Sequence, residues 1–463
     1  MHESAVVRPV RLAVVGHTNT GKTSLLRTLA RDTGFGEVSS RPSTTRHVEG
    51  VRLMADGEVL VELYDTPGME DAIALLELLE GIEGEAGERL DGPARVERFL
   101  GSAQASGRFE QEAKVLRQLL ASDAGFYVVD ARDPVLAKHR DELAILGACA
   151  VPLLPVLNFV SSPDANESAW REALSRLGLH AVVRFDTVTP ERDGERRLYE
   201  KLGTVLDAWQ PALERLIACR EREAQERHRA ALHLVAGLLI DVAAARMRID
   251  PGDETAERGA VEALSEDVRR GEQRCVDALL ALYRFRSDDV DADALPLADG
   301  RWESDLFHPE TVRDMGVKLG TGAAAGAAAG VGVDLMFGGM TLGAAAAIGA
   351  LAGGGVQAVR HFGERVFGAI TGKRELAVDD AILRLLALRE LSLVAALEAR
   401  GHAAVEPLRH SVEGDRWREG VLLPTLSRAR GRPEWSALLG EADEGARERA
   451  VEALMSEIEG ARR

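Results

Sequence analysis

Residues 16–23, with the sequence GHTNTGKT, decide the fold of the first part of this chain. They match the pattern Gly-x-x-x-x-Gly-Lys-Ser/Thr in full, follow the apolar run Arg11–Val15 and open the helical pattern Ser24–Arg31. In such a strand–loop–helix unit the glycines let backbone N–H groups point at phosphate oxygens, and the helix N-terminus adds the positive end of its dipole. The segment therefore predicts a loop that binds the phosphates of a nucleotide.

The residues of this loop receive individual predicted roles. Lys22 is expected to neutralise the β- and γ-phosphates, and the Thr23 hydroxyl is expected to bind Mg²⁺. His17 could approach the phosphates, but this position of the motif usually points outward, which is the interpretation we favour. The predicted nucleotide-binding residues are Gly16, Asn19, Thr20, Gly21, Lys22, Thr23, Ser24 and, much later in the chain, Asn158.

A second element, Asp65-Thr66-Pro67-Gly68, comes directly after the apolar run Glu58–Tyr64. An acid at this place holds magnesium through water, while the Gly68 N–H reaches the γ-phosphate and reports its loss. The polar, turn-rich residues 41–46 (RPSTTR) lie between the two elements and are expected to complete the Mg²⁺ shell. The predicted ligand there is Thr45, with Thr44 as the alternative. The predicted catalytic residues are Lys22, Thr45 and Gly68, and the predicted metal ligands are Thr23, Thr45 and Asp65.

Length and composition limit the class of protein. At 463 residues the chain exceeds one ordinary hydrophobic core, so two or more domains are expected. A formal net charge of −18 argues against a general affinity for nucleic acid, and no nucleic-acid partner is expected. The cysteines Cys149, Cys219 and Cys275 lie far apart without metal-ligand spacing, and residues 1–10 lack the apolar stretch of a signal peptide. These features predict a cytoplasmic protein.

The order of the hydrophobic patterns predicts an α/β P-loop domain followed by an all-α C-terminal domain. The first is expected to hold a mostly parallel sheet flanked by helices, with a long insertion at about 70–123 that enlarges the nucleotide-sensing segment. From Leu202 to Leu282 the pattern is helical without a strand signal and is broken by Pro251-Gly252. The predicted strands are Arg11–Val15, Glu58–Tyr64, Ala124–Val129, Val151–Leu157 and Ala181–Phe185.

Glycine and alanine dominate the stretch from Met315 to Gly372, which carries few charges. Gly322, Gly326 and Gly330 recur every four residues, and on a helix this spacing makes a flat stripe that another helix can approach closely, as in a glycine zipper. Residues 335–359 contain no formal charge over a length that could cross a bilayer, yet glycine and alanine contribute little transfer energy. Two interpretations stay open: a hairpin on or in a membrane, and a tightly packed core hairpin.

Together, the loop with Asn19, the segment Thr44-Thr45-Arg46, Asp65-Thr66-Pro67-Gly68 and Val129-Asp130-Ala131-Arg132 resemble the Era/TrmE-like GTPases of the translation-factor class. The resemblance implies GTP and GDP as ligands, Mg²⁺ as cofactor and hydrolysis of GTP to GDP and phosphate. The wider layout resembles a bacterial family that joins such a GTPase to an uncharacterised helical C-terminal domain.

The resulting domain layout has five parts. It comprises an N-terminal tail (1–9), a GTPase domain with its helical insertion (10–205), a helical region with an acidic linker (206–310), a Gly/Ala-rich hydrophobic hairpin (311–375) and C-terminal helices (376–463).

The sequence departs from this family in the base-recognition loop. The family pattern Asn-Lys-x-Asp corresponds here to Asn158-Phe159-Val160-Ser161, so the lysine and the aspartate are replaced. A serine is a weaker partner for the two guanine donors than a carboxylate, because charge-assisted hydrogen bonds are stronger than neutral ones. Asp164 and Asp186 are the candidate substitutes, and GTP is favoured over ATP because the remaining motifs are of the GTPase type.

A second departure is Met69, at the place where Ras-like proteins carry the glutamine that orients the attacking water. The resemblance suggests a replacement, because an asparagine at the Asn19 position can coordinate K⁺ near the bridge between the β- and γ-phosphates. A cation there would stabilise the charge that develops in the transition state. The alternative is that Asn19 only stiffens the loop.

The predicted function is a regulatory, slow GTPase that responds to Mg²⁺ and K⁺ and signals to an unknown protein partner. If the Gly/Ala-rich hairpin meets a membrane, the protein would lie at the inner face of the cell membrane. The alternatives are a dynamin-like, nucleotide-dependent membrane protein and a nucleotide-binding scaffold with little hydrolysis.

Overall fold

The computed structural model describes residues 8–31, 49–84, 90–188, 191, 193–249, 254–284, 297–298, 301–302, 305–307, 374–399 and 422–460. Thr44, Thr45 and nearly all of the predicted Gly/Ala-rich hairpin therefore lie outside the described residues. The chain divides into two compact units, with the main division between Gln225 and Glu226.

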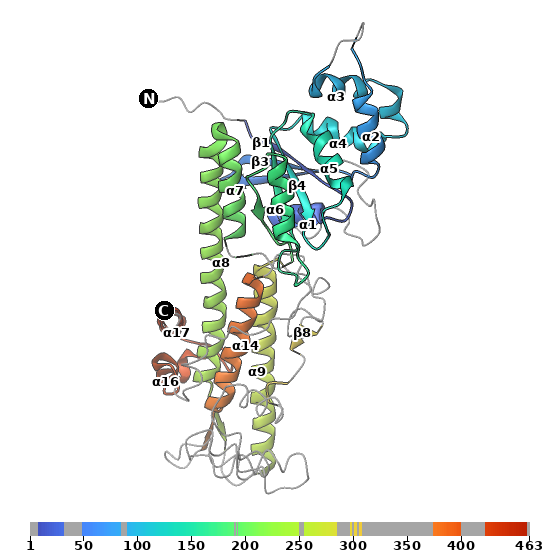
Figure 1. Ribbon diagram of the computed structural model, residues 1–463. Coiled ribbons are helices and arrows are strands. Elements are labelled where there is room, and N and C mark those ends of the chain that lie inside the picture. The colour runs from blue at the N-terminus through green and yellow to red at the C-terminus, as the bar shows by residue number, and fades with distance from the viewer. Residues whose placement is uncertain are drawn as a thin grey trace, which may run out of the picture. The chain divides into compact units, whose positions relative to one another are not determined.

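The first unit is built on a six-stranded sheet in the order β2-β3-β1-β4-β5-β6 (Figure 1). Only β2 and β3 pair antiparallel, and the other neighbours run parallel, which confirms the predicted mostly parallel sheet. The strands are β1 (Val10–Val15), β2 (Glu49–Ala55), β3 (Glu58–Asp65), β4 (Ala124–Asp130), β5 (Leu153–Asn158) and β6 (Val183–Arg184).

Strand β2 is the one strand of this sheet that the sequence did not predict. It joins β3 through Asp56 and Gly57, whose φ angles of 50° and 82° are both positive. An Asp-Gly pair at the centre of a two-residue hairpin has this geometry, because only such residues adopt two left-handed positions cheaply. The Asp-Gly pair is thus the signal that could have revealed the hairpin.

Helices cover both faces of the sheet, as expected for strands that are apolar on both sides. Val15, Tyr127 and Leu157 face one layer, and Leu12 and Phe126 face the other. The first layer comprises α2 (Ala72–Glu80), α3 (Gly92–Leu100), α4 (Glu110–Leu120), α5 (Ala137–Gly147) and α6 (Glu167–Arg176). The second layer comprises α1 (Lys22–Ala30), α7 (Gly194–Val205) and the start of α8 (Gln210–Ala244).

The insertion between β3 and β4 is helical, as its periodicity indicated. Helices α2, α3 and α4 all lie within the predicted insertion at about 70–123. Helix α3 follows the N-cap Asp91, whose carboxylate accepts a hydrogen bond from the Ala94 amide at 2.9 Å, and Pro93 occupies its first turn. An Asp followed by a proline in the first turn is a helix-start signal, so α3 was also readable from the sequence.

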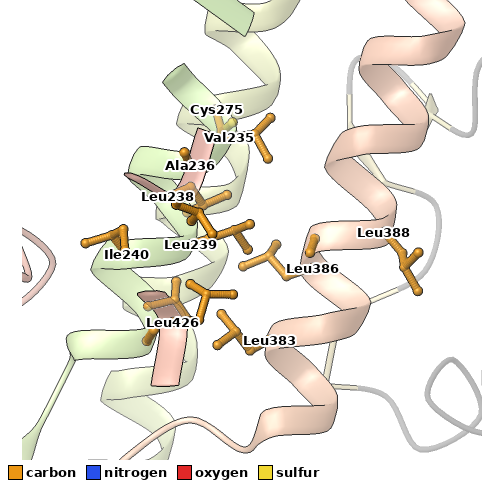
Figure 2. Close-up of a cluster of buried hydrophobic side chains, with 14 of the residues drawn as sticks. Val235, Ala236, Leu238, Leu239, Ile240, Cys275, Leu383, Leu386, Leu388 and Leu426 are labelled. Atoms are coloured by element: carbon orange, nitrogen blue, oxygen red, sulfur yellow. The ribbon is translucent and has the colours of Figure 1, made fainter. Parts of the chain in front are cut away.

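The second unit is mainly helical, which confirms the predicted helical C-terminal region. Its helices are the rest of α8, α9 (Glu254–Leu282), α14 (Asp380–Ala399), α16 (Pro424–Ala429) and α17 (Glu444–Gly460), with a short 3-10 turn at Pro433–Trp435. Figure 2 shows Leu383 and Leu386 of α14 pointing toward Leu238 and Leu239 of α8 in the buried apolar core of this unit.

Two short antiparallel pairings depart from the purely helical expectation. Strand β7 (Met247–Ile249) pairs antiparallel with β10 (Arg374–Leu376), and β8 (Leu297–Ala298) pairs with β9 (Arg301–Trp302). The predicted absence of strands between Leu202 and Leu282 is therefore wrong at β7. Three residues are too few for a periodic signal, and their partner strand is remote in the sequence. Within the described parts of the chain, no helix combines the length and apolar content that a membrane span requires.

Candidate nucleotide-binding site

The predicted phosphate loop joins the end of β1 to the start of α1 and contains three positive φ angles. They are 142° at Gly16, 61° at Asn19 and 88° at Gly21. A Cβ atom at Gly16 would lie 2.5 Å from the Val128 carbonyl oxygen. Both the backbone angle and the available space therefore require glycine at this position. Asparagine is among the few other residues that tolerate the left-handed region occupied by Asn19.

Lys22 begins α1 and folds its side chain into the loop. Its Nζ donates to the carbonyl oxygens of Gly16 at 3.1 Å and His17 at 2.6 Å, and only 7% of the residue is exposed. Burial lowers the pKa of Lys22, while the negative charges of Asp65 and Glu142 oppose this effect. The loop thus encloses a cation that nearby carboxylates stabilise.

Thr23 and Asp65 meet at the same edge of the sheet although they lie far apart in the sequence. The Thr23 hydroxyl donates to Asp65 Oδ2 at 2.6 Å, because the parallel pairing of β1 and β3 sets Val14 opposite Asp65. A hydroxyl and a carboxylate are hard oxygen donors, which fits Mg²⁺ with its remaining positions filled by phosphate oxygens and water. These two residues are therefore the ones that would hold the ion.

The Asp65-Thr66-Pro67-Gly68 turn packs directly on the phosphate loop. A Cβ at Gly68 would lie 2.4 Å from Thr18 Cγ2 and 2.7 Å from the Thr18 backbone nitrogen. The next residue, Met69, forms an isolated parallel bridge with His17 and is fully buried. The two segments expected to meet the γ-phosphate are thus in contact through their backbones.

Asn158 ends β5 and links three loops. Its Nδ2 donates to the Thr20 carbonyl at 3.0 Å, and its Oδ1 accepts from the amides of Phe159 and Thr187, both at 2.9 Å. The residue is fully buried. The structure therefore brings Asn158 against the phosphate loop, as a nucleotide-binding role would require, while its direct contact with a base stays a prediction.

The two substituted positions of the base loop, Phe159 and Ser161, each contact a charged side chain. Phe159 adopts a φ of 57°, and the guanidinium carbon of Arg132 lies 4.0 Å from the centre of its ring. Asp186 Oδ2 accepts from the Ser161 amide at 2.9 Å, whereas Asp164 lies exposed in the same loop. Of the two candidate substitutes, Asp186 is the one whose carboxylate lies beside Ser161.

Of the remaining predicted residues, Thr20 lies in the phosphate loop and Ser24 in the helix that follows it. The Thr20 hydroxyl donates to the His17 carbonyl at 3.1 Å, and Ser24 lies in the first turn of α1. Thr45, predicted as both a catalytic residue and a metal ligand, lies outside the described residues.

Sequence reasoning missed two buried carboxylates beside the site. Glu112 of α4 accepts from the amides of Glu70 and Asp71, both at 3.1 Å, and Glu142 of α5 accepts from His17 Nδ1 at 2.6 Å. Both glutamates lie in helical patterns, where a glutamate usually indicates a solvated face. No signal in the sequence distinguishes them from exposed glutamates.

Comparison with known proteins supports a GTPase domain in the first unit. The family model described as 50S ribosome-binding GTPase matches residues 11–158, which contain the phosphate loop, Asp65 and Asn158. The curated translation initiation factor IF-2 of Chlorobium phaeobacteroides (strain BS1) is 24% identical over 209 residues, which are 44% of this chain and 18% of that factor. The chain thus spans less than a fifth of the curated relative that it matches.

Several solved structures of GTPases are similar to a part of this chain. Era in complex with MgGDPNP and nucleotides of 16S ribosomal RNA is 16% identical with a TM-score of 0.31, over 43% of this chain and 56% of that chain. An Aquifex aeolicus Era variant bound to GDP and AlF4⁻ is 18% identical with the same TM-score, over 43% and 57%. The G domain of the T. maritima FeoB iron transporter is 21% identical with a TM-score of 0.25, over 43% and 99%.

The rest of the chain matches a second family model. The domain of unknown function DUF3482 extends over residues 171–456 and so includes α7, α8 and the described helices of the second unit. Because this match covers more than half of the chain, the protein belongs to the DUF3482 family, here with a GTPase domain ahead of the DUF3482 domain.

Proposed function

We propose that this GTPase domain is a Mg²⁺-dependent regulatory switch that hydrolyses GTP slowly and changes the contacts of its switch segments when the γ-phosphate leaves. The observation that carries the proposal is the 2.6 Å contact between Thr23 Oγ1 and Asp65 Oδ2, beside the buried Lys22 ammonium. Two oxygen ligands and a cation at the mouth of a phosphate loop suit a magnesium-bound triphosphate.

The chemistry would be an in-line attack of water on the γ-phosphorus. Lys22 and the loop amides would stabilise negative charge on the phosphates, while Thr23 and Asp65 would hold Mg²⁺. By sequence position, Thr45 would supply a further ligand in the triphosphate state. The Gly68 amide would detect the γ-phosphate, because its turn lies directly on Thr18.

The position of Met69 leaves the attacking water without its usual glutamine. The side chain is fully buried in the core beneath α2, and a thioether is a poor hydrogen-bond partner for water. We therefore propose that a K⁺ ion near Asn19 supplies the missing charge stabilisation. Slow hydrolysis follows from the same observation.

The preference for GTP over ATP belongs to the proposal as well. In the GTPase pattern, a carboxylate at the position of Ser161 binds the guanine base. Here the Asp186 carboxylate accepts a hydrogen bond from the Ser161 amide, so it lies beside that position. Release of phosphate from GTP and from ATP, measured at equal concentrations with Mg²⁺ and K⁺, tests both the reaction and the preference. Faster release from GTP supports the proposal, and equal or faster release from ATP contradicts it.

A nucleotide-binding scaffold with little hydrolysis is the second candidate function. The buried Met69 favours it, because its thioether is a poor hydrogen-bond partner for the attacking water. Tight GTP binding without phosphate release in either salt would select this candidate. Association with a membrane surface stays a prediction from the Gly/Ala-rich residues, and flotation of the full chain with liposomes in the presence of GTP tests it.

A further inference from the structure

The imidazole ring of His17 lies in a polar network with helix α5. Its Nδ1 is 2.6 Å from Glu142 Oε1, and its Nε2 is 2.8 Å from the Nζ of Lys138. Tyr127 of β4 donates its hydroxyl hydrogen to the other oxygen of Glu142 at 2.9 Å. The Glu142 side chain is fully buried, whereas the His17 side chain is 18% exposed. A residue of the phosphate loop is thus tied to a carboxylate inside the core.

The chemistry of the partners fixes the direction of these hydrogen bonds. A lysine ammonium can only donate, so Nε2 of His17 is the acceptor and the ring carries its proton on Nδ1. The Nδ1–H group donates a hydrogen bond to Glu142. This charge-assisted hydrogen bond reduces the free-energy cost of burying the Glu142 carboxylate. The network therefore runs from Lys138 through the His17 ring to the Glu142 carboxylate.

The groups around this network support that assignment. Burial and the charge of Glu142 raise the pKa of Tyr127 well above its ordinary value, so its hydroxyl stays a donor. The ring of His139 lies edge-on to His17 with 5.8 Å between ring centres, and burial lowers the pKa of His139. The Nδ1 atom of His139 accepts a hydrogen bond from the Leu136 amide at 3.2 Å.

The backbone of the same residue serves the phosphate site. The His17 carbonyl accepts from Lys22 Nζ at 2.6 Å and from the Thr20 hydroxyl at 3.1 Å. His17 also pairs with Met69, the residue after Gly68 in the switch turn. One residue thus connects α5, the loop lysine and the turn expected to sense the γ-phosphate.

We propose that His17 is a positioning residue for triphosphate binding, in which Glu142 and Lys138 hold the ring so that its backbone keeps Lys22 and the Gly68–Met69 turn in place. The inference rests on the proposed binding of GTP. Lys22 and the turn are the groups expected to meet the γ-phosphate, so a loosened His17 should weaken GTP binding more than GDP binding. A purely structural role would weaken both nucleotides alike.

The test compares nucleotide affinities of full-length variants. The dissociation constants for fluorescent GDP and for the non-hydrolysable GTP analogue GDPNP are measured with Mg²⁺ for the parent, His17→Gln and Glu142→Gln. We expect the constant for GDPNP to rise about tenfold or more, as for loss of a charge-assisted hydrogen bond, and that for GDP to rise much less. An unchanged ratio of the two constants in both variants would overturn the inference.

Two further variants keep the test decisive. Lys138→Met removes the donor to Nε2 at the partly exposed end of the network. It should shift the ratio in the same direction by about threefold. Asp123→Asn is the matched control, because this carboxylate accepts from Arg8 and the Arg11 amide at the opposite end of β4 and should leave the ratio unchanged. An equal shift in Asp123→Asn would also overturn the inference.

The parent protein separates this inference from the proposed function. If the parent binds neither nucleotide, the proposed function fails and the inference fails with it. If the parent binds both and the variants keep its ratio, the inference alone fails.

Discussion

Gly68 is the residue at which the two segments of the phosphate site come closest. Its α-carbon faces the backbone of Thr18, and the nearest atoms would lie 2.4 to 2.8 Å from an added Cβ. Such distances are far below van der Waals contact, and the clashing atoms include backbone that cannot rotate away. Glycine at this position is therefore a requirement of packing, in addition to its predicted role at the γ-phosphate.

The first prediction concerns the substitution Gly68→Ala. We expect it to destabilise the protein by about 1 to 3 kcal/mol, because the turn must move off the loop. Gly81→Ala is the control, since a Cβ there would meet only carbonyl oxygens at 3.5 and 3.6 Å, and its effect should stay within about 0.5 kcal/mol. Urea unfolding of both variants measures the difference, and equal stabilities would refute the close packing of the two segments.

The second prediction concerns Asn19 and monovalent cations. We expect GTP hydrolysis to be about tenfold faster in K⁺ than in Na⁺, because K⁺ would neutralise charge developing between the β- and γ-phosphates. Asn19→Ala should lose this difference while still binding GTP. Phosphate release in the two salts at equal ionic strength is the measurement. Equal turnover in both salts, or a K⁺ response that survives in Asn19→Ala, would remove the cation from the mechanism.

Residues of the phosphate loop could be predicted from the sequence because their spacing is imposed by backbone geometry. Gly16, Gly21 and Lys22 are such positions, and the structure gives each a steric or electrostatic reason. Glu112 and Glu142 could not be predicted, because their partners are backbone amides and a histidine brought together only by the fold. Local periodicity carries no information about such pairs.

At the scale of elements, the inserted helix α4 holds the start of α2. Glu112 accepts hydrogen bonds from two successive amides, those of Glu70 and Asp71, and is only 3% exposed. A carboxylate at a helix N-terminus satisfies amides that have no partner within the helix and interacts favourably with its dipole. The insertion therefore fixes the segment that follows the switch turn.

The third prediction follows from this cap. Glu112→Gln retains the size of the side chain but removes the charge, and we expect it to destabilise the protein by about 1 to 2 kcal/mol. Glu110→Gln on the same helix is the control, because its ion pair with Lys114 is exposed and should be worth less than about 0.5 kcal/mol. Hydrogen exchange of the Glu70 and Asp71 amides, just before the first turn of α2, should accelerate only in Glu112→Gln. Acceleration in both variants would argue against the cap.

Helices α9 and α14 of the second unit enclose a group of charged side chains. Glu272, Arg389 and Glu390 are each at most 6% exposed, and Trp302 Nε1 donates to Glu390 Oε1 at 3.1 Å. Burial raises the pKa of Glu272 to about 7 and that of Glu390 to about 8, although the charge of Arg389 opposes both shifts. The folded state thus retains protons that the unfolded chain has already released.

The fourth prediction is a dependence of stability on pH. The folded pKa values of Glu272 and Glu390 lie above the unfolded value of 4.5. Their contribution to the free energy of unfolding is therefore fully present below pH 4.5, and it is lost as the pH rises through the folded values of about 7 and 8. Glu390→Gln should reduce the loss between pH 6 and pH 9 by about 1 kcal/mol or more. The exposed Glu448, which contacts His233, supplies the control Glu448→Gln. Urea unfolding at the two pH values checks the prediction, and identical slopes in parent and Glu390→Gln would contradict it.

At the scale of the whole molecule, the fold class could be predicted from the sequence more reliably than the boundaries between its parts. Strongly periodic segments predicted the parallel sheet and the helical C-terminal region, because apolar spacing reflects burial. The short strands β7 and β10 escaped, since their pairing joins Met247 to Leu376 across a long stretch of chain. The division into compact units lies inside α8, after Gln225, whereas the predicted domain boundary at residue 205 stays a prediction.

The central claim is that the amides around Lys22 enclose a triphosphate whose magnesium is held by Thr23 and Asp65. Calorimetric titration of the full chain with GTP, in K⁺ buffer with Mg²⁺, tests it most directly. We predict a dissociation constant of about 1 μM or lower for the parent and for the control Lys201→Ala, whose side chain is exposed. For Lys22→Ala we predict an affinity lower by about a hundredfold. Parent protein that takes up no GTP, or Lys22→Ala that binds as well as the parent, would contradict the claim.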